Sequence, residues 1–177
     1  TKIRSLRLTT IAHIARETLK AIEALHQIGY IYGSMTPRDI YVGAPPNQSK
    51  IYLGNFGTAR KYPFTDDEAR NSLSRMGGFR SRAFLAGKEE GKKDDLESWF
   101  YCIIQIYNKE AVPWLGKDDA EEFALKEQLM EKTNESPAKK LLPAPMLSMI
   151  NDLHLSSNSA SPDYKSIHVA IDVLEKM

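Results

Sequence analysis

Apolar side chains recur at steps of three and four residues along the first clearly patterned segment, residues 8–28. This spacing places them on one face of an α-helix, and charged side chains fill the opposite face. Thr9 or Thr10 would cap the start of this helix, and Gly29 would end it. The apolar face consists of Ile11, Ile14, Ala15, Leu19, Ile22, Leu25 and Ile28. The pattern therefore predicts a long helix with one buried face.

Four further helices are predicted towards the C-terminus. Residues 94–107 are apolar on nearly all sides, which is typical of a central helix that is buried all around. Residues 117–132 form a charged amphipathic pattern, and residues 144–154 and 163–176 form two more helical patterns. A polar run at 156–162 separates the last two helices. Together these patterns make the chain mainly α-helical.

Short β-strands are predicted between the first helix and the central helix. Residues 30–32, 40–42 and 51–53 are rich in β-branched and aromatic side chains. The Gly- and Pro-containing stretch 43–49 would join the last two as a hairpin-like loop. Residues 58–93 are predicted to be irregular and basic, forming either a solvated loop or a surface that contacts an anion or a peptide. Its basic residues include Arg60, Lys61, Arg70, Arg75, Arg80 and Arg82.

Composition narrows the classes of protein that need to be considered. The chain has 177 residues and a net charge of +1, enough for one domain and without the excess charge that favours nucleic acid or a membrane surface. No apolar run approaches a membrane span and no signal peptide opens the chain, so we expect a cytoplasmic protein. The single cysteine, Cys102, lies in an apolar run and is predicted to be buried. The four histidines show no metal-ligand spacing.

The segment 31–40 carries the most informative chemistry. It reads Ile-Tyr-Gly-Ser-Met-Thr-Pro-Arg-Asp-Ile, and residues 55–57 read Asn-Phe-Gly. This layout matches the catalytic site of protein kinases, in which the two segments read His-Arg-Asp-x-Lys-Pro-x-Asn and Asp-Phe-Gly. There the first Asp takes the proton of the substrate hydroxyl, while the Asn and the second Asp hold magnesium. The chain keeps this layout and replaces most of the reactive groups.

Other motifs in the same order resemble the casein kinase 1 superfamily, particularly its tau-tubulin-kinase-like branch. Residues 94–98, Asp-Asp-Leu-Glu-Ser, resemble the start of that family's central helix, and Val-Pro-Trp at 112–114 resembles its Leu-Pro-Trp. Residues 24–31 and 56–62 resemble the end of its long helix and the segment around Asp-Phe-Gly. The resemblance implies a single domain over 1–177 with the fold of the kinase C-terminal lobe: mainly α, with short β-hairpins at the catalytic-type loop, and no N-terminal lobe in this chain.

Aligned at Pro37, four positions that carry reacting or metal-binding groups in the kinase site hold other residues. Ser34 replaces the catalytic Asp and has no carboxylate to accept a proton. Thr36 replaces a Lys and removes a cation that would face the transferring phosphate. Asp39 replaces the metal-binding Asn and is a weak candidate for holding a metal, because it still offers oxygen atoms. Asn55 replaces the metal-binding Asp and brings no negative charge.

The residues that build the frame of such a site persist. They are Pro37, Phe56, Gly57 and Asp95. The resemblance implies that Asp95 begins the buried helix and accepts hydrogen bonds from the backbone of the catalytic-type loop. A carboxylate there also suits the positive end of the helix dipole. We therefore assign Asp95 a structural role.

Arg80 and Arg82 are candidates for contacting an anion or a phosphopeptide. They lie where the resemblance places the residues that read acidic or phosphorylated substrates. Arg80 aligns best, and a small gap in the alignment would favour Arg82.

The selective loss of reacting groups leads us to expect a pseudokinase lobe that is not an enzyme. On this interpretation the ATP site is degenerate, no cofactor or metal is bound, and the lobe acts as a protein-binding or scaffolding module. We expect its partner to be a protein, with an acidic or phosphorylated peptide as one form of it. We expect neither a nucleic acid nor a membrane as partner. The alternative is a Ser/Thr kinase of the casein kinase 1 family, with residual ATP- and magnesium-dependent phosphotransfer when the N-terminal lobe is present. A third interpretation is a purely structural domain without a ligand.

Overall fold

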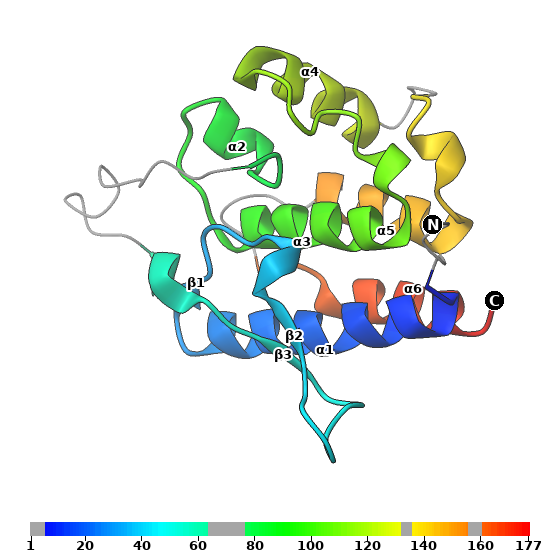
Figure 1. The fold of residues 1–177 in the computed structure, drawn as a ribbon. Helices are drawn as coiled ribbons and strands as arrows, with labels where there is room; N and C mark the ends of the chain where they lie inside the picture. Colours follow the sequence, from blue (N-terminus) through cyan, green and yellow to red (C-terminus); the bar gives the residue numbers. More distant parts are fainter. Residues whose placement is uncertain (1–5, 64–76, 132–135, 156–160) are drawn as a thin grey trace.

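A computed structural model describes residues 6–63, 77–131, 136–155 and 161–177. These residues form six α-helices and two antiparallel two-stranded sheets, which confirms the predicted mainly α fold (Figure 1). The helices are α1 (Leu8–Gln27), α2 (Arg82–Leu85), α3 (Lys92–Tyr107), α4 (Asp119–Met130), α5 (Ala144–Leu155) and α6 (Tyr164–Glu175). The strands are β1 (Tyr30–Ile31), β2 (Ile40–Val42), β3 (Ile51–Leu53) and β4 (Arg60–Lys61). No helix in the described parts is both long and apolar enough to cross a membrane.

Helix α1 buries the apolar face that its sequence predicts. Its start differs from the prediction, because the N–H of Thr10 already donates to the carbonyl of Arg7 and the helix has therefore begun before Thr9 or Thr10 could cap it. Gly29 follows the end of the helix with a φ of +82°, a conformation that side chains with a Cβ disfavour. Ile28 lies beyond the last helical turn and is exposed, so it does not belong to the buried face.

Helix α3 is the buried centre of the fold. Every residue from Asp94 to Ile104 is buried, including Cys102 as predicted. The indole N–H of Trp99 donates to the hydroxyl of Thr18 on α1 across 2.9 Å, so even the polar group of this large side chain is satisfied inside the core. Figure 1 shows α1 and α6 side by side on one side of α3 and α4 on the other. The central position of α3 explains why its sequence is apolar on nearly all sides from Leu96 onward.

The two sheets lie at the edge of the helical body. Strands β2 and β3 pair with Ile40 opposite Leu53, as the predicted hairpin requires, and their loop projects away from the helices (Figure 1). Strand β1 pairs instead with β4, in a register that places Ile31 opposite Arg60. The prediction that residues 58–93 are irregular is therefore wrong for β4 and α2. Arg70 and Arg75 lie outside the described residues.

Candidate functional site

The catalytic-type loop is shaped by a short 3₁₀ turn, η1 (Pro37–Asp39). Pro37 occupies the first turn, where a missing N–H costs nothing. The backbone N–H and the hydroxyl of Thr36 donate to Oδ2 of Asp39 across 2.8 Å and 3.1 Å, and the Thr36 hydroxyl accepts from the N–H of Arg38 at 3.3 Å. This reciprocal capping holds Asp39 buried beneath the loop, with 4% of its surface exposed.

Asn55 meets Asp39 from the other segment of the site. Its side-chain amide donates to Oδ1 of Asp39 across 2.8 Å. Asn55 has a left-handed backbone, with φ 58° and ψ 55°, which asparagine tolerates better than most residues that carry a Cβ. The structure thus brings together two predicted positions that are 16 residues apart.

Tyr32 fixes the turn that presents Asn55. Its hydroxyl donates to the carbonyl of Gly54 at 2.5 Å and lies 3.2 Å from the carbonyl of Asn55. Burial, together with the charge on Asp39, raises the pKa of Tyr32, which therefore remains a hydrogen-bond donor. Phe56 packs its ring edge-to-face on Tyr32 with 5.5 Å between the ring centroids, although half of Phe56 is exposed. Tyr32 thus ties the catalytic-type loop to the Asn-Phe-Gly segment.

Asp95, on α3, holds the catalytic-type loop in place through hydrogen bonds to its backbone. Its carboxylate accepts from the backbone N–H groups of Tyr32 and Gly33 at 2.5 Å and 2.8 Å. The ring of His26 lies between Asp95, 2.7 Å from Nε2, and the hydroxyl of Tyr164, 2.5 Å from Nδ1. A neutral ring that donates through Nε2 and accepts through Nδ1 satisfies every group.

His26 was missed because sequence reasoning tested the histidines only for metal-ligand spacing. A signal was available: His26 lies four residues after Ile22 and so extends the buried stripe of α1. A histidine on a buried stripe must find hydrogen-bond partners inside the protein.

Ser34 is half-buried, and its backbone N–H donates to the hydroxyl of Thr58 at 3.3 Å. That hydroxyl in turn donates to the carbonyl of Tyr32 at 3.0 Å. A Cβ built at Gly57 would approach only Oδ1 of Asn55, at 3.8 Å, so nothing in the structure explains a need for glycine at this position.

A pocket of about 740 Å³ opens above the Asp39–Asn55 pair. Thr36 and Pro37 also line it, whereas Ser34, Phe56, Gly57 and Asp95 do not. The remaining lining residues are Arg38, Tyr41, Gly77, Phe79 and Gln105. Sequence reasoning gave Arg38 no role, yet its exposed side chain brings a cation to a pocket that has lost the lysine expected at Thr36.

Arg80 and Arg82 lie away from this pocket and are each paired with two carboxylates. Arg80 contacts Asp119 and Glu122 at 2.7 Å and 2.6 Å. Arg82 contacts Glu97 at 3.2 Å and Glu127 at 2.7 Å. A phosphate arriving at either guanidinium group would therefore meet the negative charge of two carboxylates.

Lys126 is buried beside Arg80 and contacts the same carboxylate, Glu122. The ammonium group of Lys126 lies 2.5 Å from the carbonyl of Arg80, 2.6 Å from Glu122 and 4.5 Å from the ring centre of Tyr101. Burial lowers the pKa of Lys126 to about 8, while Glu122 opposes that shift. Lys126 therefore anchors the segment before α2 to α4.

Three curated proteins of Caenorhabditis elegans are similar to the chain. The putative serine/threonine-protein kinase ZK507.1 is 32% identical over 129 residues, which cover 70% of this chain and 39% of the relative. The putative serine/threonine-protein kinase ZK507.3 is 31% identical over 124 residues, covering 70% of this chain and 30% of the relative. The serine/threonine-protein kinase spe-6 is 34% identical over 122 residues, which cover 65% of this chain and 31% of the relative. The chain thus spans well under half the length of the relatives it matches. No protein-family profile matches it.

These relatives correct the prediction that the chain is not an enzyme. All three are named as serine/threonine-protein kinases, which points to an enzyme. The prediction rested on the altered groups at Ser34, Thr36, Asp39 and Asn55. It did not include the cation of Arg38, which lines one pocket together with the carboxylate of Asp39. The mainly helical fold and the similarity to these kinases together support a protein-kinase-like domain.

Proposed function

We propose that the chain forms the C-terminal lobe of a Ser/Thr protein kinase of casein kinase 1 type, close to its tau-tubulin-kinase-like branch. When an N-terminal lobe completes the site, this lobe supports slow ATP-dependent phosphotransfer to a protein substrate. The observation that carries the proposal is the 2.8 Å contact between Asn55 and Asp39 in the pocket. A kinase site needs one amide and one carboxylate at these two positions. Here both groups are present, in exchanged order.

The donor set of this pair suits a magnesium ion that is shared with nucleotide phosphates. Asn55 turns its NH₂ group towards Asp39, which leaves its carbonyl oxygen as a ligand. Magnesium in such sites takes only one or two protein carboxylates and completes its shell with phosphate oxygens and water. Among the described residues, no three His, Cys, Asp or Glu side chains gather as a metal site of their own. Asp39 and Asn55 would therefore hold the ion, which when bound neutralises charge on the phosphates.

The other residues of the site account for a slow rate. Arg38 offers positive charge for a phosphate in place of the lysine missing at Thr36. Ser34 cannot orient the substrate hydroxyl as a carboxylate does, and a general base contributes roughly 10²- to 10⁴-fold to rate. Because the transition state of phosphoryl transfer is loose, positioning and charge stabilisation carry most of the catalysis. The proposal therefore expects a weakened reaction.

Restoring the missing carboxylate tests the proposal. In the full-length polypeptide that contains this chain, Ser34→Asp should raise the rate of labelled-phosphate transfer from ATP to casein by about 100-fold or more. Asp39→Ala in that background should abolish the gain, and Glu110→Gln, at an exposed acid away from the pocket, should leave it unchanged. A folded Ser34→Asp protein, with an unaltered circular dichroism spectrum and melting temperature, that transfers no more phosphate than the original would refute the proposal.

A protein-binding role is a second candidate, favoured by a group of exposed apolar side chains beside the pocket. Tyr41, Val42 and Tyr52 on the β2–β3 hairpin and Phe56 are between 48% and 64% exposed. Exposed apolar side chains beside a pocket favour an interface, either with an N-terminal lobe or with another protein. Quantitative affinity purification with the full-length protein and its Val42→Asp variant tests this role. A partner retained by the first and lost by the second supports it, and identical partner sets argue against it.

A further inference from the structure

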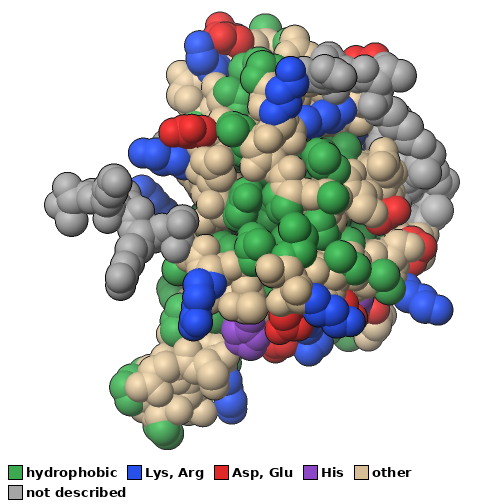
Figure 2. All heavy atoms as spheres, turned by 90° about the vertical axis from the view of Figure 1, so that its right-hand side faces the viewer, with side chains coloured by type: hydrophobic (Ala, Val, Ile, Leu, Met, Phe, Trp, Pro, Cys, Tyr) green, Lys and Arg blue, Asp and Glu red, His purple; other side chains and the backbone are tan. Residues whose placement is uncertain are grey.

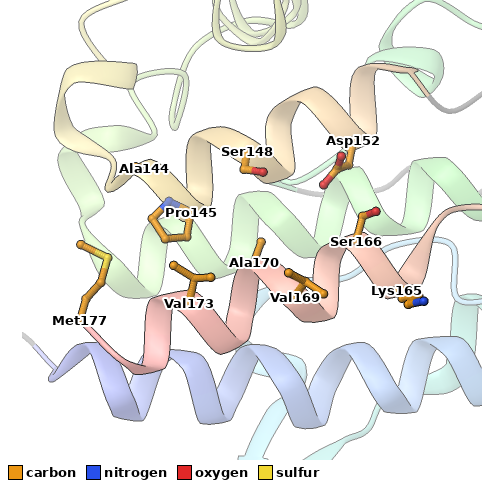
Figure 3. Close-up of a pocket in the computed structure, with 10 residues that line it drawn as sticks. All are labelled: Ala144, Pro145, Ser148, Asp152, Lys165, Ser166, Val169, Ala170, Val173 and Met177. Atoms are coloured by element: carbon orange, nitrogen blue, oxygen red, sulfur yellow. The ribbon is translucent and has the colours of Figure 1, made fainter.

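Helix α6 contacts a buried polar group of α1 through Tyr164, its first residue. The side chain of Tyr164 is half-buried, and its hydroxyl lies 2.5 Å from Nδ1 of His26. The two rings are tilted by 56°, with 6.0 Å between their centroids. Figure 2 and Figure 3 show the surface and the ribbon of this side of the molecule, and in Figure 3 α6 lies between α5 and α1. One polar contact thus joins the start of α6 to the last turn of α1.

The remainder of α6 packs as an ordinary surface helix. Its core side is formed by four buried residues, Ile167, Ala170, Ile171 and Leu174. On its outer side, Val169 and Val173 are 55% and 49% exposed and line an open groove beside α5. This groove shares no residue with the pocket above Asp39 and Asn55. Tyr164 is therefore the residue of α6 whose contact leads towards the site.

A line of hydrogen bonds continues from His26 to the backbone of the catalytic-type loop. Nε2 of His26 lies 2.7 Å from Oδ2 of Asp95, and these two residues are only 2% and 3% exposed. The same carboxylate accepts from the backbone N–H groups of Tyr32 and Gly33. Those two residues directly precede the serine that aligns with the catalytic Asp of kinases. The start of the loop is therefore anchored to a side chain that His26 contacts.

The groups in this line determine the state of the His26 ring. A carboxylate only accepts, so Nε2 carries the proton that bonds to Asp95. In the neutral ring Nδ1 is then an acceptor, and the hydroxyl of Tyr164 is its donor. Burial raises the pKa of Tyr164, and the charges of Glu23 and Asp95 add to this shift, so the phenol keeps its proton. Each group in the line has a partner of the matching kind.

The hydroxyl of Tyr164 also fixes the orientation of the ring. A histidine ring can turn about its bond to Cβ, and Nε2 points at Asp95 in only one orientation. Among the described residues, no second donor contacts Nδ1 of His26. Without the hydroxyl, Nδ1 would be a buried acceptor that lacks a donor, which costs free energy and favours other ring orientations. The bond from His26 to Asp95 would weaken as a result.

We propose that Tyr164 and His26 are positioning residues for the phosphotransfer site. Tyr164 fixes the His26 ring, and the ring fixes the carboxylate of Asp95. That carboxylate holds the backbone of Tyr32 and Gly33. Neither Tyr164 nor His26 lines the pocket, so they act on the geometry of the loop and not on affinity for a ligand. The effect on rate rests on the phosphotransfer proposed above, whereas the effect on the loop backbone does not.

Hydrogen exchange measured by NMR tests the link to the loop without an assay of activity. In the ¹⁵N-labelled full-length polypeptide that contains this chain, Tyr164→Phe should speed exchange of the Tyr32 and Gly33 amide protons by about fivefold or more. The signal of the His26 Nε2 proton should shift or broaden. Tyr30→Phe, which removes the hydroxyl of a tyrosine that is 40% exposed, should change neither. Unchanged exchange at the loop in a folded Tyr164→Phe protein would overturn the proposal, as would acceleration confined to α6.

Kinetics test the effect on rate in the same polypeptide carrying Ser34→Asp. Adding Tyr164→Phe should lower kcat for phosphate transfer to casein about tenfold, because the loop is misplaced, and should leave KM for ATP unchanged. His26→Gln keeps an N–H donor for Asp95, so its kcat should exceed that of His26→Leu. Tyr30→Phe should leave kcat unchanged. Melting temperatures above the assay temperature show that each variant is folded.

The outcomes distinguish this proposal from the phosphotransfer itself. If the Ser34→Asp protein transfers no phosphate, the proposed function fails, and exchange at the loop still supports or overturns the link from Tyr164. If phosphate is transferred and Tyr164→Phe leaves kcat unchanged, or only raises KM for ATP, the two residues do not position the site. Equal kcat values for His26→Gln and His26→Leu would show that Asp95 needs no donor from His26.

Discussion

The side-chain amide of Asn55 donates to the carboxylate of Asp39 across 2.8 Å, so the two positions that align with the metal-holding residues of kinases are in direct contact. The contact requires an amide at one position and a carboxylate at the other. The Asn55 amide supplies a donor to the Asp39 carboxylate, which is only 4% exposed. The same carboxylate caps the turn that carries it through Thr36. One side chain therefore shapes the loop and supplies the negative charge of the site.

Asn55→Asp should make the stability of the lobe depend on divalent cations. The change removes the hydrogen bond to Asp39 and sets two carboxylates against each other. This repulsion destabilises the fold by about 1–3 kcal/mol without metal. Magnesium or manganese should restore much of this loss, since the cation relieves the repulsion. The backbone conformation of residue 55 tolerates Asp. Thermal melts in EDTA and in manganese measure both effects, and equal melting temperatures in the two buffers would contradict the expectation.

Tyr32→Phe should destabilise the protein by about 1–3 kcal/mol, because the carbonyl of Gly54 loses its donor in a part-buried site. The aromatic contact with Phe56 is kept, so the loss reports the hydroxyl alone. Urea denaturation measures the change. Tyr41→Phe is the matched control, since the side chain of Tyr41 is half exposed. A Tyr32→Phe protein as stable as the Tyr41→Phe protein would show that the hydroxyl does not hold the turn.

The free energy of unfolding should decrease as the pH rises from about 4 to 6, because Asp94 loses its proton in this range. Burial raises the pKa of this carboxyl from 3.8 to about 6, and the nearby charge of Glu97 adds to that shift while Lys93 and the N–H of Gly91 oppose it. Within this window the unfolded chain loses its proton first, so deprotonation favours unfolding as the pH rises. The cost reaches at most about 3 kcal/mol and is complete above the folded pKa.

Asp94→Asn should flatten this part of the pH profile and raise stability at pH 7. Asparagine keeps an oxygen for the N–H of Gly91, which donates to Asp94 at 2.8 Å, and carries no charge to bury. Denaturation with urea at pH 4, 5, 6 and 7 gives the profile. Asp172→Asn, at an exposed acid that pairs with Arg16, should leave the slope between pH 4 and 6 intact. A slope that survives Asp94→Asn would assign the dependence to other groups.

Phosphopeptide binding should be weak in the unaltered protein and should strengthen when the carboxylates around the arginines are neutralised. Asp119 and Glu127 are 72% and 49% exposed and pair with Arg80 and Arg82, so a phosphate must compete with them. Asp119→Asn combined with Glu127→Gln should raise the affinity for a phosphoserine peptide several-fold. Isothermal titration measures the change. If Arg80→Ala in the double variant leaves the affinity untouched, Arg80 does not bind the phosphate.

The elements that depend on local pattern were predictable from the sequence. The steps of three and four residues in α1 and the all-round apolar character of α3 determine helices whichever partners they meet, because periodicity fixes which face is buried. The β2–β3 hairpin was also predictable from local sequence, since a short Gly- and Pro-containing loop joins its strands. The replacements at Ser34, Thr36, Asp39 and Asn55 were also legible in the sequence, as chemical groups at aligned positions.

Contacts between distant segments were decided only by the tertiary structure. The pairing of β1 with β4 joins residues about 30 positions apart, and the bond from His26 to Asp95 spans 69 positions. No periodicity encodes such contacts, because they depend on how the helices pack. The same holds for Arg80, because only packing places α4 and its two carboxylates against this predicted anion contact. The sequence specified the helices and the altered chemistry, whereas packing determined which of those groups face a pocket and which neutralise one another.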